Sequence, residues 1–315
     1  MILKKVFSVF SLFLLLLLTA CQVNPNTPPG SQSGPHSEAQ SAAQSVPASQ
    51  SDTAPALQPD PVPAPQPAPQ PAPQPAPEPP AKPNHTLYIL MYHDIVEDGT
   101  PCNNWTTTVS RLREDLTWLR EHGYTFVLPR ELAAGQPLPQ KAVMVTFDDG
   151  YESNFTLGLP IFSDCDAKCV ISLITHHQED RTPGFLTWSQ CRAMQRTGLV
   201  EFGSHTHNLH LRSQDPKGPQ ATGRMAGESR EAYALRVFPD LQTSIDLMTK
   251  QLGQPPAFLA YPHGIADKWE MDFVAEHFAM SVTTKHGPAN IAKGLYNLRR
   301  HNITVENPPS KYLPA

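Results

Sequence analysis

A long proline-rich segment limits which part of this 315-residue chain can fold. Residues 22–84 contain no Phe, Trp or Tyr and hold 19 of the 35 prolines, with Pro-Ala-Pro-Gln repeats over positions 63–78. A segment of this composition buries too little apolar surface to offset the entropy of ordering it. We therefore expect residues 22–84 to be a disordered spacer, extended as polyproline II in the repeats. A proline-rich ligand for a partner domain is the alternative.

The first 21 residues have the organisation of an export signal. Two lysines precede an apolar run over residues 6–18, and Thr19-Ala20-Cys21 follows. The run is short for a membrane span, and basic, apolar and small-residue regions in this order are typical of a secretory signal. The cysteine after Ala20 resembles the lipidation site of bacterial lipoproteins. This resemblance implies that residues 1–21 are a lipoprotein signal with a lipidated Cys21, and that the exported protein is anchored on the outer face of the bacterial cell membrane. A simple cleaved signal or an uncleaved anchor is the alternative.

Residues 85–315 remain for a folded domain, and their number suffices for one α/β core. The formal net charge of −5 and the lack of a basic run argue against nucleic acid as a partner. Export permits disulfides, and Cys165 with Cys169 is the pair favoured by proximity. No Cys-x-x-Cys pair indicates a cysteine-bound zinc. We expect the four cysteines of this domain, which include Cys102 and Cys191, to be structural or incidental.

Strand-like and helix-like segments alternate along this domain. Strands are expected at 87–92, 124–128, 142–147, 168–174, 199–202, 257–261, 279–283 and 298–305. Helices are expected after an N-cap at Ser110, over 151–162, after Thr187, over 231–252 and over 268–278. Repeated strand–helix units predict a parallel sheet, here closed as a (β/α) barrel. Residues 211–230, rich in Gly, Ser, Gln and Pro, are expected to form a surface insertion.

The strand over residues 142–147 ends in Asp148-Asp149-Gly150. Because Gly150 can form a tight turn at no steric cost, both carboxylates can face a cleft at the carboxyl end of the strand. Adjacent carboxylates suit a division of labour in which one binds a metal and the other stays free as a general base. A bare Asp-Asp-Gly is more often a simple acidic turn, so this motif needs support from elsewhere in the chain.

That support lies about 55 residues further on, in Ser204-His205-Thr206-His207-Asn208-Leu209-His210. His205 and His210 can bring neutral imidazoles to one metal if the loop curls, and Asp149 can add a carboxylate oxygen. Two histidines and one carboxylate leave an open position for water, as a catalytic zinc requires. The same set also suits non-haem iron oxygenases, so ligand type alone leaves the metal open. A solvated histidine-rich loop is the alternative.

These motifs resemble those of the polysaccharide deacetylases, the NodB-homology domains of carbohydrate esterase family four. The resemblance covers residues 85–305 and rests on five segments in the family's order: Met91-Tyr92-His93, Thr146-Phe147-Asp148-Asp149-Gly150, Leu186-Thr187-Trp188, Gly203-Ser204-His205-Thr206 and Ala260-Tyr261-Pro262. It implies a distorted (β/α) barrel of the NodB-homology type. It also implies that Asp148 is the general base and that Asp149, His205 and His210 bind a divalent metal, zinc before cobalt or nickel.

The spacing of the two histidines indicates which group of enzymes within the family this chain resembles. The family usually places its two histidines four residues apart, but position 209 is Leu, and His205 and His210 are five apart. This spacing resembles the poly-N-acetylglucosamine deacetylases of the intercellular adhesin type. His207 is then expected to be a neighbour of the site rather than a ligand.

The family's later motifs are less complete in this chain. Pro262-His263 keeps the proline of the third motif, so the backbone N–H of His263 can hold an oxyanion. Leu259 stands where the family has an arginine that orients the base. Arg299 and Arg300 are the candidates to replace that arginine.

The remaining candidates are a general acid and a set of substrate-binding residues. His301 is the first candidate for the acid, although Leu298-Arg299-Arg300-His301 has one residue more than the family's final motif. His263 and His93 are the other candidates for the proton. Trp269 is the candidate for the tryptophan that walls the family's sugar pocket. Tyr261, His93 and Arg300 complete the expected substrate-binding residues.

The resemblance implies a metal-dependent hydrolase, with a monomeric catalytic domain, that removes N-acetyl groups from an extracellular polysaccharide of the poly-β-1,6-N-acetylglucosamine type. Two alternatives keep the enzyme class and change the substrate to peptidoglycan N-acetyl groups or xylan O-acetyl esters. The long spacer suits peptidoglycan, whereas the five-residue histidine spacing favours the exopolysaccharide. A third alternative is a tethered glycan-binding module with an inactive site, supported only by the missing arginine.

Overall fold

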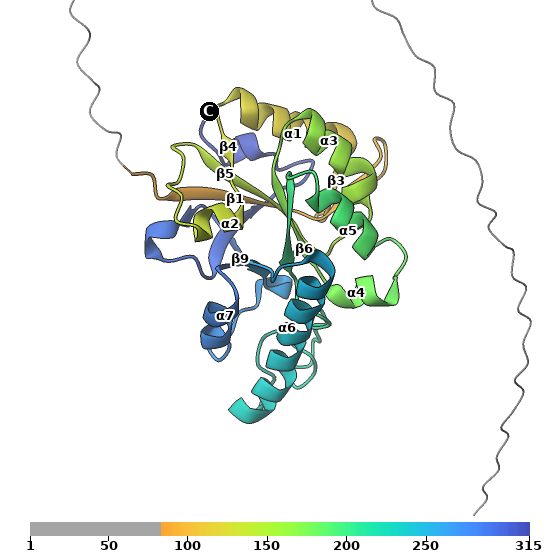
Figure 1. Ribbon diagram of the computed structural model, residues 1–315, viewed down its shortest axis with the longest axis vertical. Helices are drawn as coiled ribbons and strands as arrows, with labels where there is room; N and C mark the ends of the chain where they lie inside the picture. The colour runs from red at the N-terminus through yellow and green to blue at the C-terminus, as the bar shows by residue number, and fades with distance from the viewer. Residues whose placement is uncertain (1–82) are drawn as a thin grey trace, which may run out of the picture. The chain divides into compact units, whose positions relative to one another are not determined.

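The computed structural model describes residues 83–315 (Figure 1). The predicted lipoprotein signal over residues 1–21, with Cys21, lies outside the described residues, as does the predicted spacer up to residue 82. None of the helices within residues 83–315 combines the length and the apolar character needed to cross a bilayer.

Seven parallel strands of the described region close into a ring. Going round the ring, β1 (Thr86–Tyr92) is followed by β11 (Leu298–Asn302), β9 (Met280–His286), β8 (Phe258–Ala260), β7 (Val200–Ser204), β6 (Cys169–Leu173) and β5 (Ala142–Phe147), which pairs again with β1. Short β4 (Thr125–Phe126) lies beside β5, and β10 (Ala289–Asn290) runs antiparallel to β1. Two further strands, β2 (Asp94–Val96) and β3 (Thr106–Thr108), pair separately. The predicted distorted (β/α) barrel is confirmed.

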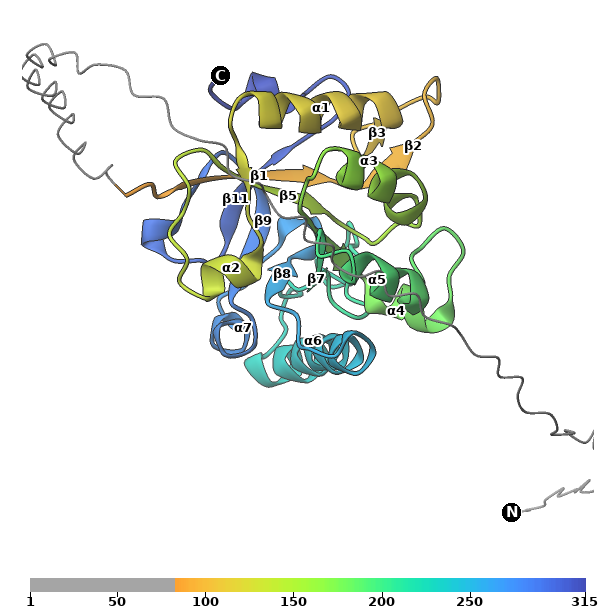
Figure 2. The ribbon, with the colours of Figure 1, turned by 45° about the horizontal axis from the view of Figure 1, so that its top comes forward.

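Helices cover the outside of the barrel. Figure 2 shows α1 and α3 on one side of the strands and α6 and α7 on the opposite side. The helices are α1 (Val109–Glu121), α2 (Pro129–Ala133), α3 (Leu159–Asp164), α4 (Thr175–Asp180), α5 (Trp188–Gln195), α6 (Arg230–Leu252) and α7 (Met271–His277). A π-helical turn, Asn154–Gly158, precedes α3, and single 3-10 turns lie at Pro262–Gly264, Ile291–Lys293 and Pro309–Lys311.

Several local expectations were wrong in detail. Helix α1 is capped by Thr108, whose hydroxyl accepts from the Arg111 N–H at 3.2 Å, and not by Ser110. The helix expected over 151–162 begins as a π-helical turn, and Pro160 at the start of α3 has no N–H to give to a regular helical bond. The cysteines of the described chain are free, so the pair suggested by the proximity of Cys165 and Cys169 is not formed.

Side chains alternate between the barrel interior and the helix-covered outside. On β1, Leu87 and Ile89 belong to the interior cluster, whereas Leu90 and Tyr92 pack beneath the helices. Strands β5, β8, β9 and β11 alternate in the same way, as period two requires. This alternation decides which polar residues can reach the open end of the barrel.

Candidate active site

The adjacent carboxylates Asp148 and Asp149 follow β5 directly, at the carboxyl end of the parallel strands. The chain turns sharply there, because Asp149 has φ 74° and Gly150 has φ 80°. A Cβ atom added to Gly150 would lie 2.7 Å from the side chain of Leu173, so this position requires glycine. The left-handed backbone at Asp149 is unusual for a non-glycine residue and lets both carboxylates face the same cavity.

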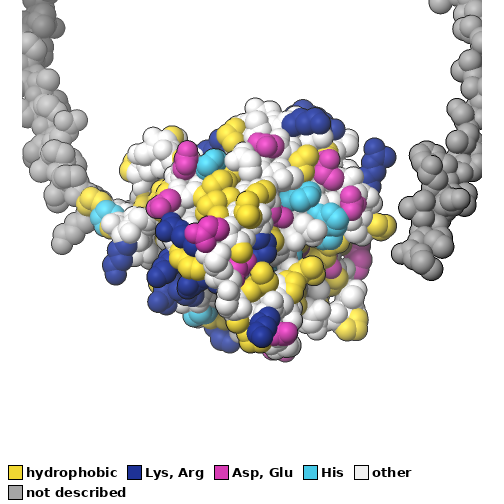
Figure 3. Space-filling model, turned by 90° about the horizontal axis from the view of Figure 1, so that it is seen from below, with side chains coloured by type: hydrophobic (Ala, Val, Ile, Leu, Met, Phe, Trp, Pro, Cys, Tyr) yellow, Lys and Arg dark blue, Asp and Glu magenta, His cyan; other side chains and the backbone are white. Residues whose placement is uncertain are grey.

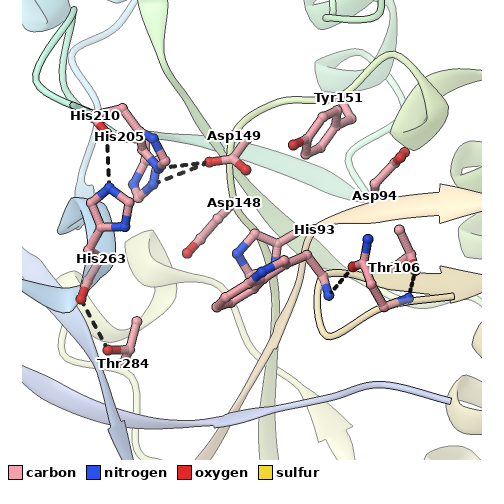
Figure 4. Close-up of a pocket in the computed structure, with 12 residues that line it drawn as sticks. His93, Asp94, Thr106, Asp148, Asp149, Tyr151, His205, His210, His263 and Thr284 are labelled. Atoms are coloured by element: carbon pink, nitrogen blue, oxygen red, sulfur yellow. Dashed lines mark hydrogen bonds and ion pairs between the residues drawn. The ribbon is translucent and has the colours of Figure 1, made fainter. Parts of the chain in front are cut away.

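That cavity has a volume of about 370 Å³. Figure 4 shows His205, His210 and His263 on one side of the two carboxylates, with Tyr151 and Asp94 on the other. Six residues named from the sequence line this one cavity: His93, Asp148, Asp149, His205, His210 and His263.

Three of these residues form a group that could hold a metal ion. One atom from each of Asp149, His205 and His210 lies within 4.8 Å of the other two. The Nε2 atoms of His205 and His210 are each 3.4 Å from Asp149 Oδ1, and this oxygen is buried without a hydrogen-bond donor. A buried carboxylate oxygen facing two imidazole nitrogens fits a divalent cation. His207 lies outside the group, with its Nδ1 atom 3.1 Å from the Thr175 hydroxyl.

The histidines of this group are held in the form that binds metal. His205 Nδ1 lies 2.6 Å from the Ala260 carbonyl, which can only accept, so Nδ1 carries the proton and Nε2 faces Asp149 with its lone pair. Burial lowers the pKa of both His205 and His210 to about 4, so both rings are neutral near pH 7. Burial also raises the pKa of Asp149, and a cation at its free oxygen would favour the charged form.

Asp148 is held differently, by a buried arginine. Arg300 donates from Nη1 and Nη2 to the two carboxylate oxygens of Asp148, at 2.8 and 2.7 Å. The guanidinium is itself 1% exposed and is fixed by hydrogen bonds to the Thr283 carbonyl and the Thr146 hydroxyl. Burial alone would raise the pKa of Asp148, but the charge of Arg300 and its hydrogen bonds hold that pKa well below its usual range.

Arg300 therefore lies behind Asp148 and does not face the cavity. It is absent from the cavity lining, so its expected contact with substrate is wrong, whereas its contact with Asp148 is the one expected of the arginine missing at Leu259. Successive side chains of β11 point alternately into and out of the barrel, which explains why Arg300 and not Arg299 reaches Asp148. Leu298 and Arg300 point inward, and Arg299 points outward and donates to the His286 carbonyl.

The same alternation excludes His301 as the group that protonates a substrate in this cavity. Its ring lies outside the barrel, stacked on Tyr312 at 4.7 Å between centroids and edge-on to His286 at 4.5 Å. It is buried there and is not part of the cavity lining. The candidate general acids that remain in the cavity are His93 and His263.

Two expected substrate-binding residues also lie elsewhere. Tyr261 is fully buried on the outward side of β8, in the cluster beneath α6 and α7. Trp269 packs edge-on against Tyr233 at 5.5 Å, and the Arg224 guanidinium lies 4.4 Å from its ring centroid. Neither residue lines the cavity, and the fully buried Tyr261 cannot contact a substrate, so that expectation was wrong.

The cavity contains residues that carried no motif signal. They come mainly from the segment between β2 and β3 and from the strand ends: Asp94, Asn103, Trp105, Thr106, Tyr151 and Thr284. Trp105 lies edge-on to His93, with 4.8 Å between ring centroids. An unpatterned tryptophan between two expected elements was the one signal in the sequence that could have drawn attention to this segment.

Comparison with known proteins agrees with this geometry. Residues 135–277 match the polysaccharide deacetylase family. The poly-beta-1,6-N-acetyl-D-glucosamine N-deacetylase of Escherichia coli (strain K12) is 27% identical over 72% of this chain and 38% of its own length. The protein of the same name from Staphylococcus aureus (strain MSSA476) is 24% identical over 51% of this chain and 55% of its length. The chain therefore spans from about two fifths to about half of these relatives.

A solved structure supports the same assignment. The Streptococcus pyogenes deacetylase PplD in complex with acetate superimposes with a TM-score of 0.60 at 26% identity, covering 74% of this chain and 100% of that one. The family match includes the strand ends that carry the two aspartates and two histidines. Residues 135–277 therefore resemble a polysaccharide deacetylase domain, in a barrel that this chain shares with a solved deacetylase.

Proposed function

We propose that this protein is a metal-dependent hydrolase that removes N-acetyl groups from an N-acetylglucosamine polysaccharide of the poly-β-1,6-linked type. The observation that carries the proposal is the pairing of two differently supported carboxylates in one cavity. Asp148 is kept charged by Arg300, and Asp149 faces His205 and His210.

Asp149, His205 and His210 would hold the metal, which we propose to be zinc because two imidazoles and a carboxylate with an open position suit it. When bound, such an ion supplies Lewis-acid chemistry: it polarises a carbonyl and makes water a stronger acid. Cobalt or nickel are the alternatives to zinc. This assignment makes the three side chains ligands and leaves Asp148 free.

Asp148 then acts as the general base. The base must be charged before it can accept a proton, and the bidentate contact with Arg300 maintains that charge in a buried position. The contact also fixes the orientation of the carboxylate, because both of its oxygens are engaged by one planar guanidinium that is itself anchored on Thr283 and Thr146. In this role Arg300 is a positioning residue.

We assign the proton donor to His93. Its Nδ1 atom is buried without a hydrogen-bond partner and its ring lines the cavity. The other candidate, His263, already has its Nε2 atom 2.9 Å from the His210 carbonyl. Burial lowers the pKa of His93 to about 4, so the free protein has a neutral ring and the proton has to be supplied during the reaction. The backbone N–H of His263, next to Pro262, is proposed to stabilise the oxyanion.

The substrate class rests on two observations. The five-residue spacing of His205 and His210 brings both rings to Asp149 in this barrel. Both relatives described above are named for poly-β-1,6-N-acetyl-D-glucosamine. We further propose that the exported protein is held on the outer face of the membrane by a lipid on Cys21, with residues 22–84 as a spacer.

Acetate release tests the proposal. The full chain, stripped with a chelator and then given zinc or cobalt, should release acetate from β-1,6-linked N-acetylglucosamine oligomers only after the metal is restored. Release from peptidoglycan instead would keep N-deacetylation and change the substrate, and release from acetylated xylan would change the reaction to ester hydrolysis. Release from none of the three, with one metal ion bound per chain, would contradict the proposed activity and favour the glycan-binding module.

A further inference from the structure

Trp105 is exposed to a degree that is unusual for a tryptophan in this fold. Its exposed fraction is 53%, whereas the chain's other three tryptophans, Trp118, Trp188 and Trp269, are buried or half-buried. Apolar side chains on the face shown in Figure 3 are interspersed with charged ones. Trp105 differs from such scattered apolar residues because it lines the cavity that holds Asp148 and Asp149.

The segment that carries Trp105 is firmly held although it has no regular structure. The backbone N–H of Trp105 donates to Asn103 Oδ1 at 2.7 Å, and its carbonyl accepts from the Asp94 N–H at 3.1 Å. The Asn302 side chain, from the end of β11, donates to the Asn104 carbonyl at 3.1 Å. These bonds tie the segment to two separate parts of the barrel, so the indole is presented in a fixed position before any ligand binds.

The surroundings of the ring leave much of it open. Its contact with the His93 ring is edge-like, with an interplanar angle of 66°. By comparison, Trp269 is covered by the Arg224 guanidinium and the edge of Tyr233. An indole face carries negative partial charge and attracts positively polarised hydrogens, such as the axial C–H groups of a pyranose ring. In N-acetylglucosamine those C–H groups form an apolar face while the hydroxyl groups project around the rim.

We propose that Trp105 is a sugar-binding platform, on which a pyranose ring of the polysaccharide stacks beside the reacting acetamide. This inference rests on the proposed function and names the residue that holds the sugar. It also places the platform on the segment between β2 and β3, away from the half-buried Trp269. Because a stacked ring is bound equally before and during the reaction, Trp105 should affect substrate binding more than the chemical step.

The kinetic test compares Trp105 with a matched tryptophan. Trp118 also packs against a histidine, His122, at 4.1 Å between centroids, but it lies on α1 outside the cavity. In the zinc-loaded full chain, Trp105→Ala should raise KM for a β-1,6-linked N-acetylglucosamine pentamer about tenfold or more, with kcat within about threefold. The KM of Trp105→Phe should lie between those of Trp105→Ala and the unmodified protein. Trp118→Phe should have the KM and kcat of the unmodified protein. An unchanged KM in Trp105→Ala, or a fall in kcat alone, would overturn the platform.

A binding test separates this inference from the proposed activity. In a zinc-loaded full chain carrying Asp148→Asn, the pentamer should change the tryptophan emission, because a sugar ring covers an exposed indole. Adding Trp105→Phe should abolish the change, and adding Trp118→Phe should preserve it. One outcome is that the unmodified protein releases no acetate while the emission change is lost with Trp105→Phe and kept with Trp118→Phe. This result would support the sugar-binding role of Trp105 and contradict the proposed activity. An emission change that survives Trp105→Phe, or none in any variant, would overturn the platform whatever the activity. Equal thermal midpoints for Trp105→Phe and Trp118→Phe would exclude a folding defect as the cause.

Discussion

The barrel holds a buried carboxylate beside an arginine at each end, and the pKa values of the two carboxyl groups shift in opposite directions. At the carboxyl end, Asp148 after β5 pairs with Arg300. At the other end, Glu201 near the start of β7 lies 3.6 Å from the Arg130 Nε atom. Glu201 and His205 share the inward face of β7, four residues apart, so one strand reaches both ends of the barrel.

The two arginines differ in burial and in contact geometry. Arg300 is buried and bonds both oxygens of Asp148, whereas the Arg130 side chain is 39% exposed and leaves Glu201 Oε1 without a hydrogen bond. Burial is the largest influence on both carboxyl groups. At Asp148 the arginine outweighs burial and the pKa falls, whereas at Glu201 burial prevails and the pKa rises to about 7.

This difference shows what keeps a buried carboxylate charged. In this barrel the carboxylate that stays charged is the one whose two oxygens are both engaged by a fully desolvated guanidinium. A partly solvated arginine at 3.6 Å does not achieve this. The buried, bidentate arginine lies at the end of the barrel that carries the candidate metal-binding group. The partly exposed, distant arginine lies at the opposite end.

The largest effect is expected from Arg300→Leu. Removing one partner of a buried pair leaves an uncompensated charge, so the free energy of unfolding should fall by about 3–5 kcal/mol. Acetate release should fall about a hundredfold or more, because Asp148 loses both its charge support and its orientation. Urea unfolding and steady-state kinetics measure the two effects.

The double variant Arg300→Leu with Asp148→Asn is the control for that experiment. It removes the charge that Arg300→Leu leaves behind, so it should recover a substantial part of the lost stability and none of the activity. A single variant as stable and as active as the unmodified protein would show that the buried pair is not the support of the base.

An intermediate effect is expected from Glu201→Gln, and it should depend on pH. The folded pKa of about 7 lies above the value of an unfolded glutamate, so the folded state binds more protons between these values. The stability that Glu201 contributes is complete below about pH 4.5 and is lost as the pH rises through 7. Glu201→Gln should therefore gain on the order of 2 kcal/mol relative to the unmodified protein between pH 4.5 and pH 8. Urea unfolding of both proteins at pH 4.5 and pH 8 measures the difference in their free energies of unfolding. If that difference were the same at both pH values, burial would not be raising the pKa of Glu201.

The smallest effect is expected from Arg130→Met. The side chain is partly solvated and its ion pair is long, so its loss should cost about 1 kcal/mol or less. The kcat and KM for acetate release should stay within about twofold, because Arg130 lies outside the active cavity. A loss of stability as large as that of Arg300→Leu would remove the contrast between the two ends.

The sequence was sufficient to predict the barrel and to predict which residues come together as a candidate metal-binding group. Alternating apolar residues marked most strands of the ring, and Asp148, Asp149, His205 and His210 stood at strand ends that a parallel barrel brings together. Alternation along β11 from the inward-facing Leu298 places Arg300 inward and Arg299 outward. The sequence did not show that Leu298 faces inward, nor that the pairing of β11 with β9 shifts between Leu298 and Arg300.

The positions of His301 and Trp105 could not be predicted from the sequence. The candidate acid His301 was placed by its position in a motif, and that motif is one residue longer here, so the ring falls on the outer face of β11. Trp105 lies in a segment whose shape is set by side-chain to backbone hydrogen bonds and by a contact with distant Asn302. The hydropathy and periodicity of a sequence do not predict hydrogen bonds of this kind.

The most direct test of the account measures bound zinc and acetate release together in Asp148→Asn and Asp149→Asn. We propose that Asp148 is the base and that Asp149 binds the metal. Asp148→Asn should keep about one zinc per chain and lose about a thousandfold in kcat. Asp149→Asn should lose both the zinc and the activity. If Asp148→Asn lost its zinc, or kept its activity, the division of labour between the two neighbouring carboxylates would be contradicted.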